Sequence, residues 1–156
     1  MQAILFVCLG NICRSPTAEA VTRAKAPHLS LDSAGTAGYH IGKPPYGPMQ
    51  DAAKTRGYAM SDLRARRVSA DDFHHFDLII AMDDENAADL EALRPAGATT
   101  PVQLFTEYAS ADGAPVPKDV PDPYYTRDFE GCLDLIEACA EGLISGGLTR
   151  RYSAPA

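Results

Sequence analysis

The sequence lacks any hydrophobic run long enough to cross a membrane. The apolar stretch near the start, residues 3–9, is too short for the core of a signal peptide, and no later stretch approaches the roughly 18 residues that a spanning helix needs. We therefore expect a soluble protein that does not bind membranes. Because no export signal is recognised, we also expect a cytoplasmic location.

An excess of positive charge is missing as well. The chain has 14 Lys and Arg residues against 21 Asp and Glu residues, which gives a formal net charge of −7. Nonspecific nucleic-acid binding needs a basic surface that neutralises phosphates, so the composition argues against nucleic acid as a partner. Net charge does not restrict a single site, however, and a local basic pocket is compatible with it.

Cysteine is scarce, and its four positions are Cys8, Cys13, Cys132 and Cys139. A chain of 156 residues folds without disulfide bonds, and in a reducing compartment cysteines are catalytic, metal-binding or buried. A zinc site built from all four is disfavoured, because Cys-x4-Cys is not a typical zinc spacing. Cys132 and Cys139 fall on the apolar face of a predicted helix, which indicates core packing.

Length and hydrophobic pattern predict one α/β domain. With 46% hydrophobic residues, the chain has enough apolar material for a single core. Short apolar runs predict strands at 3–8, 29–33, 77–82 and 101–105, and helices are predicted at 16–26, 49–56, 83–93 and 126–143. This alternation indicates a parallel sheet with right-handed crossovers, which binds ligands at the carboxyl ends of its strands. We expect the domain to cover residues 1–149 and the tail 150–156 to be frayed.

Three connecting segments carry specific expectations. Ser15 is predicted to cap the first helix, with Pro16 at the first helical position, where its missing N–H costs nothing. Residues 108–123, rich in Pro, Ala and Asp, are predicted to form a long loop, and such loops in compact domains are usually functional. His74 and His75 lie among aspartates and suggest a metal site, but a solvated turn is the favoured interpretation.

The residues that follow the first strand carry the chemistry. A strand, a glycine-containing loop and a helix form a cradle for phosphate, because their N–H groups converge on an anion. The loop lacks the Gly-Lys-Ser/Thr ending of nucleotide-binding P-loops, which argues against ATP. Cys8 faces the helix N-terminus, which favours a thiolate with a pKa below the usual value of roughly 8.5. Arg14 can bind two phosphate oxygens, so the pattern predicts a thiolate nucleophile beneath a bound phosphoryl group. The phosphate-binding residues would be Leu9, Gly10, Asn11, Ile12, Cys13 and Arg14.

Residues 8–16 read Cys-Leu-Gly-Asn-Ile-Cys-Arg-Ser-Pro, and residues 122–125 read Asp-Pro-Tyr-Tyr. The first segment resembles the signature of the low-molecular-weight protein tyrosine phosphatases of the bacterial type, and the second is similar to the acid loop of that family. Stretches 32–35, 42–45 and 76–83 also fit, in the order expected for the family. The resemblance implies an α/β fold: a single-domain, three-layer sandwich with a four-stranded parallel sheet in the order 2-1-3-4 and helices on both faces.

The resemblance also implies hydrolysis of phosphotyrosine in protein substrates, with no metal and no cofactor. Cys8 attacks phosphorus to form a phosphocysteine, and Asp122 protonates the leaving phenolate and then acts as base toward water. Ser15 helps Cys8 to leave, whereas Asn11 and Ser33 brace the cradle by hydrogen bonds. Inorganic phosphate or another oxyanion would occupy the site. In a bacterial source a tyrosine kinase is a candidate substrate, and we expect a monomer or a weak dimer.

The substrate pocket of the family implies walls formed by Leu9, Ile12, Tyr39, Tyr124 and Tyr125. A deep apolar slot favours a phosphoaryl group, because a phosphoserine is too short to reach the cysteine at its base. The related bacterial phosphoarginine phosphatases carry threonine at the position of Ile12, so isoleucine favours phosphotyrosine.

Three positions depart from the family pattern. Leu63 replaces a histidine that takes part in the bracing network, so the rigidity of the cradle or the pKa of its thiolate is expected to differ in this chain. Tyr46 and Pro48 stand where an aspartate and an arginine usually follow the Pro-Pro pair. They make the pocket mouth aromatic and uncharged, which bears on substrate preference rather than on the reaction.

The role of one cysteine and the function itself leave alternatives open. Cys13 packs behind the loop or, as the family suggests, forms a reversible disulfide with Cys8 that protects the nucleophile from overoxidation. Arsenate reduction occurs on the same scaffold but needs further redox cysteines near the third strand, where this chain has Ala81 and Met82. A noncatalytic phosphoprotein-binding module is the third class, and the intact set of catalytic residues argues against it.

Overall fold

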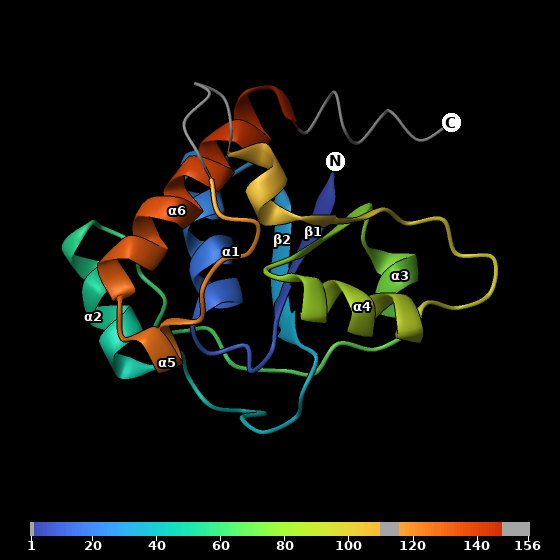
Figure 1. Ribbon diagram of the computed structural model, residues 1–156, viewed down its shortest axis with the longest axis horizontal. Helices are drawn as coiled ribbons and strands as arrows, with labels where there is room; N and C mark the ends of the chain where they lie inside the picture. Colours follow the sequence, from blue (N-terminus) through green and yellow to red (C-terminus); the bar gives the residue numbers. More distant parts are fainter. Residues whose placement is uncertain (1, 110–115, 148–156) are drawn as a thin grey trace.

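The computed structural model describes residues 2–109 and 116–147 and contains a parallel sheet between two layers of helices (Figure 1). The strands are β1 (Ala3–Cys8), β2 (Ser30–Gly35), β3 (Leu78–Ala81) and β4 (Val102–Leu104). The helices are α1 (Arg14–Lys25), α2 (Gly47–Thr55), α3 (Asp72–His75), α4 (Asp84–Leu93), α5 (Pro123–Thr126) and α6 (Phe129–Gly142). A 3-10 turn at Phe105–Tyr108 follows β4, and a π-helical turn at Leu143–Gly147 follows α6. Within the described ranges no helix is both long and apolar enough to span a bilayer.

The four strands pair in the order β2-β1-β3-β4, and all of them run parallel. In the register of β1, Cys8 lies opposite Gly35 of β2, and Val7 lies opposite Ala81 of β3. Strands covered on both faces need apolar side chains throughout, which explains the continuous hydrophobic runs of β1 and β3. The predicted sheet and its strand order are confirmed. Parallel pairing brings the carboxyl ends of β1, β2 and β3 to one edge of the sheet.

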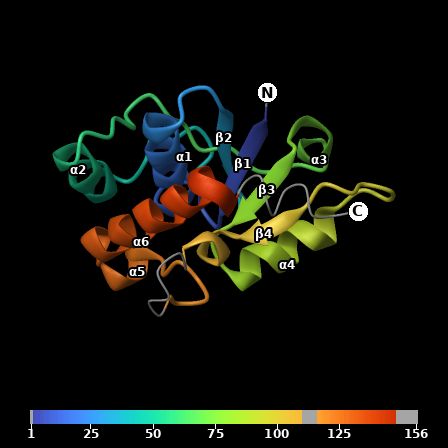
Figure 2. The ribbon, with the colours of Figure 1, turned by 90° about the horizontal axis from the view of Figure 1, so that it is seen from above.

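Helices cover both faces of the sheet, as the three-layer prediction requires. Ile4 and Phe6 of β1 belong to a buried cluster with residues of α1 and α6. Leu5 and Val7 point the other way, because successive strand residues alternate in direction, and they pack with Leu90 of α4. Figure 2 shows the same arrangement, with α1 and α6 on one side of the strands and α4 on the other.

Two predictions about helix starts are wrong. α1 begins at Arg14, so Ser15 lies inside the first turn, and Cys13 holds the N-cap position without a side-chain cap. The Ser15 hydroxyl instead contacts the Cys8 sulfur, accepts from the Asn11 amide and donates to the Ala34 carbonyl. The helix predicted at 126–143 begins only at Phe129, as α6, because Arg127 adopts a left-handed conformation with φ of 63° that ends the short helix α5 before it.

The other predicted strands and helices are present, with ends that differ by about two residues. The helix α2 is followed by Gly57 in a left-handed conformation (φ 88°), which is typical of a residue that ends a helix. Residues 110–115 of the predicted long loop and the predicted frayed tail 150–156 lie outside the described residues. The domain boundary near residue 149 therefore stays a prediction.

Two isoleucines test the packing of the central sheet. Ile80 of β3 is fully buried, whereas Ile41 is 61% exposed. Ile80→Ala should lower the free energy of unfolding by about 2–5 kcal/mol, because the neighbours fill the resulting cavity only in part. Ile41→Ala removes the same atoms from the surface and should change it by less than about 0.5 kcal/mol. Urea denaturation followed by circular dichroism measures both, and equal losses would contradict the burial of β3.

Candidate active site

The carboxyl end of β1 delivers Cys8 to a tight loop, residues 9–14, that leads into α1. The Cys8 sulfur accepts a hydrogen bond from the backbone N–H of Asn11 at 3.2 Å. It also lies 3.0 Å from the Ser15 hydroxyl oxygen, in hydrogen-bonding contact. Hydrogen-bond donors at the start of a helix stabilise negative charge, so this position suits a sulfur anion.

Asn11 shapes the 9–14 loop from the inside. Its backbone is left-handed, with φ of 59°, and its side chain is buried. The side-chain amide donates to the hydroxyl oxygens of Ser15 at 2.8 Å and Ser33 at 3.0 Å, and its oxygen accepts from the backbone N–H of Arg66 at 3.0 Å. Ser33 donates in turn to Glu19 at 2.7 Å. The two residues predicted to brace the cradle therefore lie in one hydrogen-bonded chain that ends at Cys8.

Gly35, at the end of β2, packs against the 9–14 loop. A Cβ atom at this position would lie 2.7 Å from the carbonyl oxygen of Leu9 and 3.1 Å from the carbonyl carbon of Gly10. Both atoms belong to the backbone and cannot rotate away, so only glycine fits. The backbone of Gly35 is also tied to the Arg66 region, because its N–H donates to the Arg66 carbonyl at 2.8 Å.

Arg14 is a buried cation, with a side chain 3% exposed. Its Nη1 donates to Asp83 at 2.7 Å and to the carbonyl of Val120 at 3.0 Å, while Nη2 lies 3.4 Å from the Asp122 carboxylate. Burial would lower the pKa of Arg14, but the negative charges of Cys8, Asp83 and Asp122 outweigh burial and raise it above its usual value. Arg14 Nε is buried without a partner among the described residues, so one donor is left for a ligand.

Cys8, the 9–14 loop and the Asp-Pro-Tyr-Tyr segment meet at a pocket of about 230 Å³. Its walls are formed by Cys8, Leu9, Gly10, Ile12, Cys13, Arg14, Tyr39, His40, Asp122, Tyr124 and Tyr125. Every side chain that the sequence assigned to the pocket wall lies here. Tyr39 and Tyr125 form an exposed aromatic rim at its mouth, with 73% and 72% of their surface accessible.

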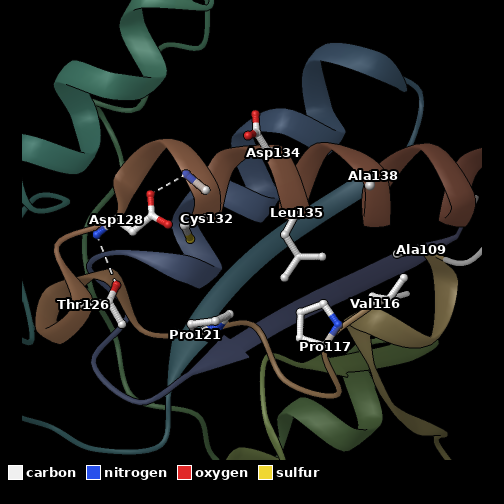
Figure 3. Close-up of a pocket in the computed structure, with 11 residues that line it drawn as sticks. Ala109, Val116, Pro117, Pro121, Thr126, Asp128, Cys132, Asp134, Leu135 and Ala138 are labelled. Carbon is white, nitrogen blue, oxygen red and sulfur yellow. Dashed lines mark hydrogen bonds between the residues drawn. The ribbon is translucent and has the colours of Figure 1, made fainter. Parts of the chain in front are cut away.

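A larger cavity of about 560 Å³ lies between α6 and residues 116–121 (Figure 3). The side chains of Leu135, Pro117 and Pro121 make it largely apolar, and the Cys132 sulfur lies near one end. Among its described lining residues none is Lys, Arg or His. This cavity is larger than the Cys8 pocket, but the smaller pocket holds the cation and the polar groups that an anionic substrate needs.

Comparison with known proteins agrees with this geometry. A family model described as "Low molecular weight phosphotyrosine protein phosphatase" matches residues 3–152. The chain is 41% identical over 151 residues to the low molecular weight protein-tyrosine-phosphatase YfkJ of Bacillus subtilis, covering 93% of this chain and 95% of that protein. This chain belongs to the low molecular weight protein-tyrosine-phosphatase family. It is therefore a hydrolase.

Solved structures of such phosphatases have the same fold. The crystal structure of YfkJ superimposes with a TM-score of 0.86 at 39% identity, covering 96% of each chain. An Entamoeba histolytica protein tyrosine phosphatase with Hepes in its active site gives a TM-score of 0.82 at 36% identity, covering 92% of this chain and 95% of that one. Vibrio vulnificus Wzb in complex with benzylphosphonate gives 0.79 at 29% identity, with coverages of 90% and 94%.

Burial raises the pKa of three thiols of the phosphatase. Cys13 lies at the pocket but is buried, and burial together with the charge of Cys8 raises the pKa of its thiol well above the usual range. Burial also raises the pKa of Cys132 and of Cys139 to about 12. Both lie on the buried face of α6, as predicted. All four cysteines are free thiols.

The described residues contain no group of three or more His, Cys, Asp or Glu side chains arranged to hold a metal ion. His74 and His75 are exposed on α3, a single helical turn between Asp71 and β3. This position agrees with the predicted solvated turn, although the turn is helical.

The departures from the family pattern have different structural consequences. Leu63 is half-buried and packs against the main core cluster, so it does not replace the polar contacts of a histidine. The Asn11 side chain nevertheless has a partner for its oxygen and two for its nitrogen. Tyr46 occupies the N-cap position of α2, where it makes no side-chain cap, and Pro48 lies in the first turn. A proline fits there because the first-turn N–H groups have no partner within the helix.

Four residues of the site were missed by sequence reasoning. Asp83 was predicted only as the first residue of a helix. It caps α4 by accepting from the Asn86 N–H at 2.8 Å, but its other oxygen anchors Arg14. Its position directly after β3, at the same sheet edge as Cys8, was a signal that could have revealed this role. No such signal marked the other three residues, because each contacts a part of the chain that is distant in sequence. Glu19 accepts from Ser33 in β2, Gly35 packs against the 9–14 loop, and His40 lies next to Gly10.

Alkylation should distinguish the four thiols. At pH 8 iodoacetamide should label Cys8 and leave Cys13, Cys132 and Cys139 unlabelled, because burial raises the pKa of these three thiols. A thiol whose pKa is raised to about 12 is a thiolate in roughly one molecule in 10,000 at pH 8, and this fraction rises about tenfold with each unit of pH. Mass spectrometry of the labelled peptides gives the rates, and urea-unfolded protein is the control in which all four react. Labelling of Cys132 as fast as Cys8 would contradict the prediction.

Substitution of Gly35 should disturb the 9–14 loop. Gly35→Ala places a methyl group against the Leu9 and Gly10 backbone, and relieving that overlap should cost about 1–3 kcal/mol of unfolding free energy. Gly47→Ala is the matched control, because a Cβ atom there meets nothing within 4 Å. It should leave stability unchanged or raise it by up to about 1 kcal/mol, since Gly47 is helical. Chemical denaturation compares the two, and equal stabilities would show that the loop yields without cost.

Proposed function

We propose that the protein hydrolyses phosphotyrosine monoesters in protein substrates through a phosphocysteine on Cys8. The observation that carries the proposal is the convergence of three groups on one pocket: the Cys8 sulfur, the buried Arg14 guanidinium and the Asp122 carboxylate. A nucleophile, a fixed cation and an acid around one pocket are what phosphoryl transfer to a thiol requires. Membership of the phosphatase family supports the same reaction.

The phosphoryl group binds in the 9–14 loop. Its equatorial oxygens take hydrogen bonds from the loop N–H groups and from Arg14, whose unpartnered Nε supports this role. Arg14 is held in place by Asp83 and the Val120 carbonyl, so it needs no reorganisation when the substrate arrives. The long Nη2 contact with Asp122, at 3.4 Å, is the one that a phosphate oxygen displaces.

In the first step the Cys8 thiolate attacks phosphorus, and the bond from phosphorus to the phenolic oxygen breaks. Asp122 gives its proton to that oxygen, a general-acid contribution of about 10²- to 10⁴-fold in rate. In the second step Asp122 takes a proton from water, the water oxygen attacks phosphorus, and the bond from phosphorus to sulfur breaks. Ser15 stabilises the departing thiolate through its contact with the sulfur, which supports a role in this step. Inorganic phosphate is then released.

The pocket walls support an aryl substrate. Leu9 and Ile12 offer apolar side faces, and Tyr124 and Tyr125 pack edge-to-face with ring centroids 5.4 Å apart. Offset and edge-to-face contacts are the favoured geometries for a further aromatic ring, such as the one of phosphotyrosine. Benzylphosphonate, bound by the Vibrio vulnificus relative, is an aromatic ring that carries a phosphonate, and this supports the same substrate class.

Hydrolysis of p-nitrophenyl phosphate in EDTA, measured across pH, tests the proposal. The wild type should show a bell-shaped pH profile, and Cys8→Ser should lose activity. With an aryl phosphate that has a poor leaving group, Asp122→Asn should lose about 10²- to 10⁴-fold in kcat/KM. Asp119→Asn is the matched control: Asp119 also precedes the Tyr-Tyr pair but bonds to the Asp84 N–H, away from the pocket. Activity retained by Cys8→Ser would overturn the proposed mechanism.

A further inference from the structure

Behind the pocket wall, Tyr46 and Arg127 make a set of contacts that the proposed reaction does not use. The Tyr46 ring packs on Tyr124, with centroids 5.1 Å apart, and on Phe129 at 6.1 Å. The Arg127 guanidinium lies over both Tyr46 and Phe129, at 5.3 and 5.1 Å from the ring centroids. Its Nη1 also donates a hydrogen bond to the Tyr46 hydroxyl at 2.9 Å. We call Tyr46, Arg127 and Phe129 the clasp.

Tyr46 connects the clasp to the 9–14 loop. Its backbone N–H donates to the carbonyl of Ile12 at 2.8 Å, and its own carbonyl accepts from Gln50 in α2 at 3.0 Å. The residue is therefore fixed by its main chain to the loop that surrounds Cys8. Its side chain reaches away from that loop to α5, which lies beside α2 in Figure 1.

Arg127 connects the clasp to Asp122. Residues 122–127 form one hydrogen-bonded unit: the Asp122 side chain accepts from the Tyr124 N–H at 3.0 Å, and the Arg127 N–H donates to the Pro123 carbonyl at 2.9 Å. A shift at one end of so short a unit is passed to the other. Arg127 closes the unit in a left-handed conformation that is unfavourable for a residue with a side chain, and such conformations persist where surrounding contacts hold them.

We propose that Tyr46 and Arg127 are positioning residues that hold the 122–127 unit against the 9–14 loop. This places the Asp122 carboxyl next to the phenolic oxygen of the leaving group. The inference rests on the proposed function and explains how the general acid of that reaction, Asp122, is positioned. Tyr46 and Arg127 are absent from the pocket wall, so they act through Tyr124 and the backbone of the unit. The clasp spans 81 residues of sequence between its hydrogen-bonded members.

Arg127→Gly separates positioning from folding. Glycine adopts a φ of 63° without strain, so this variant removes the guanidinium while making the local backbone easier to form, and its thermal midpoint should stay equal or rise. Its kcat/KM should nevertheless fall by about tenfold for phenyl phosphate, because a misplaced acid no longer protonates a poor leaving group. For p-nitrophenyl phosphate, whose leaving group needs less protonation, the loss should be smaller. The dependence of kcat/KM on leaving-group pKa should therefore steepen.

Variants of Tyr46 separate the effect of its ring contacts from the effect of its hydrogen bond with Arg127. Tyr46→Phe keeps the ring and loses the hydrogen bond from Arg127, so it should retain more of the wild-type leaving-group dependence than Tyr46→Leu, which loses both. Arg94→Ala is the matched control, because Arg94 lies over the Phe73 ring at 5.0 Å on the other face of the sheet. That variant should leave the leaving-group dependence unchanged.

The outcomes separate the clasp from the proposed function. A wild-type leaving-group dependence in both Arg127→Gly and Tyr46→Leu would overturn the clasp while hydrolysis by the wild type stands. A loss of activity that is equal for all leaving groups would also overturn it, because general weakening of the fold acts on every substrate alike. Absence of hydrolysis in the wild type itself would overturn the proposed function, and the clasp with it.

Discussion

The site depends on the hydrogen bonds that the buried side chain of Asn11 makes. The left-handed backbone of Asn11 turns its N–H toward the Cys8 sulfur. This conformation persists because the Asn11 side chain is hydrogen-bonded to Ser15, Ser33 and the Arg66 N–H. These partners come from the first turn of α1, from β2 and from the segment after α2. The loop around Cys8 is therefore shaped by the junction of three segments, and β1 supplies only its starting point.

Charge is concentrated at the same edge of the sheet. In a chain with a net charge of −7, one buried guanidinium sits between a carboxylate that follows β3 and another in the 122–127 unit. Removing one partner of a buried ion pair leaves the other uncompensated, so Arg14, Asp83 and Asp122 constrain each other's positions. This concentration of charge is a property of the local arrangement and is independent of the acidic composition. Tyr46 contacts the same 122–127 unit through Tyr124 and Arg127.

Sequence reasoning succeeded where the controlling interactions are local. Continuous apolar runs identified β1 and β3, and the spacing of Cys8 and Arg14 identified the loop between them, because these residues are neighbours along the chain. Sequence reasoning failed where a remote partner decides the outcome. Ser15 was predicted to be an N-cap but bonds to Asn11 and to the Ala34 carbonyl. The helix predicted from residue 126 begins only at Phe129, after Arg127, whose left-handed backbone is accompanied by contacts with Tyr46.

The sequence by itself determined the order of strands and helices along the chain, the presence of a glycine-containing loop between β1 and α1, and the identity of the groups available for chemistry, because each depends on residues within one segment. The tertiary structure decided which carboxylates contact Arg14. It also decided that Gly35 packs against the Leu9 carbonyl and that Tyr46 packs on the Tyr124 ring. Those contacts join residues far apart in the chain, and their geometry follows from how the sheet edge and the helices pack. A pattern of neighbouring residues in the sequence does not specify such contacts.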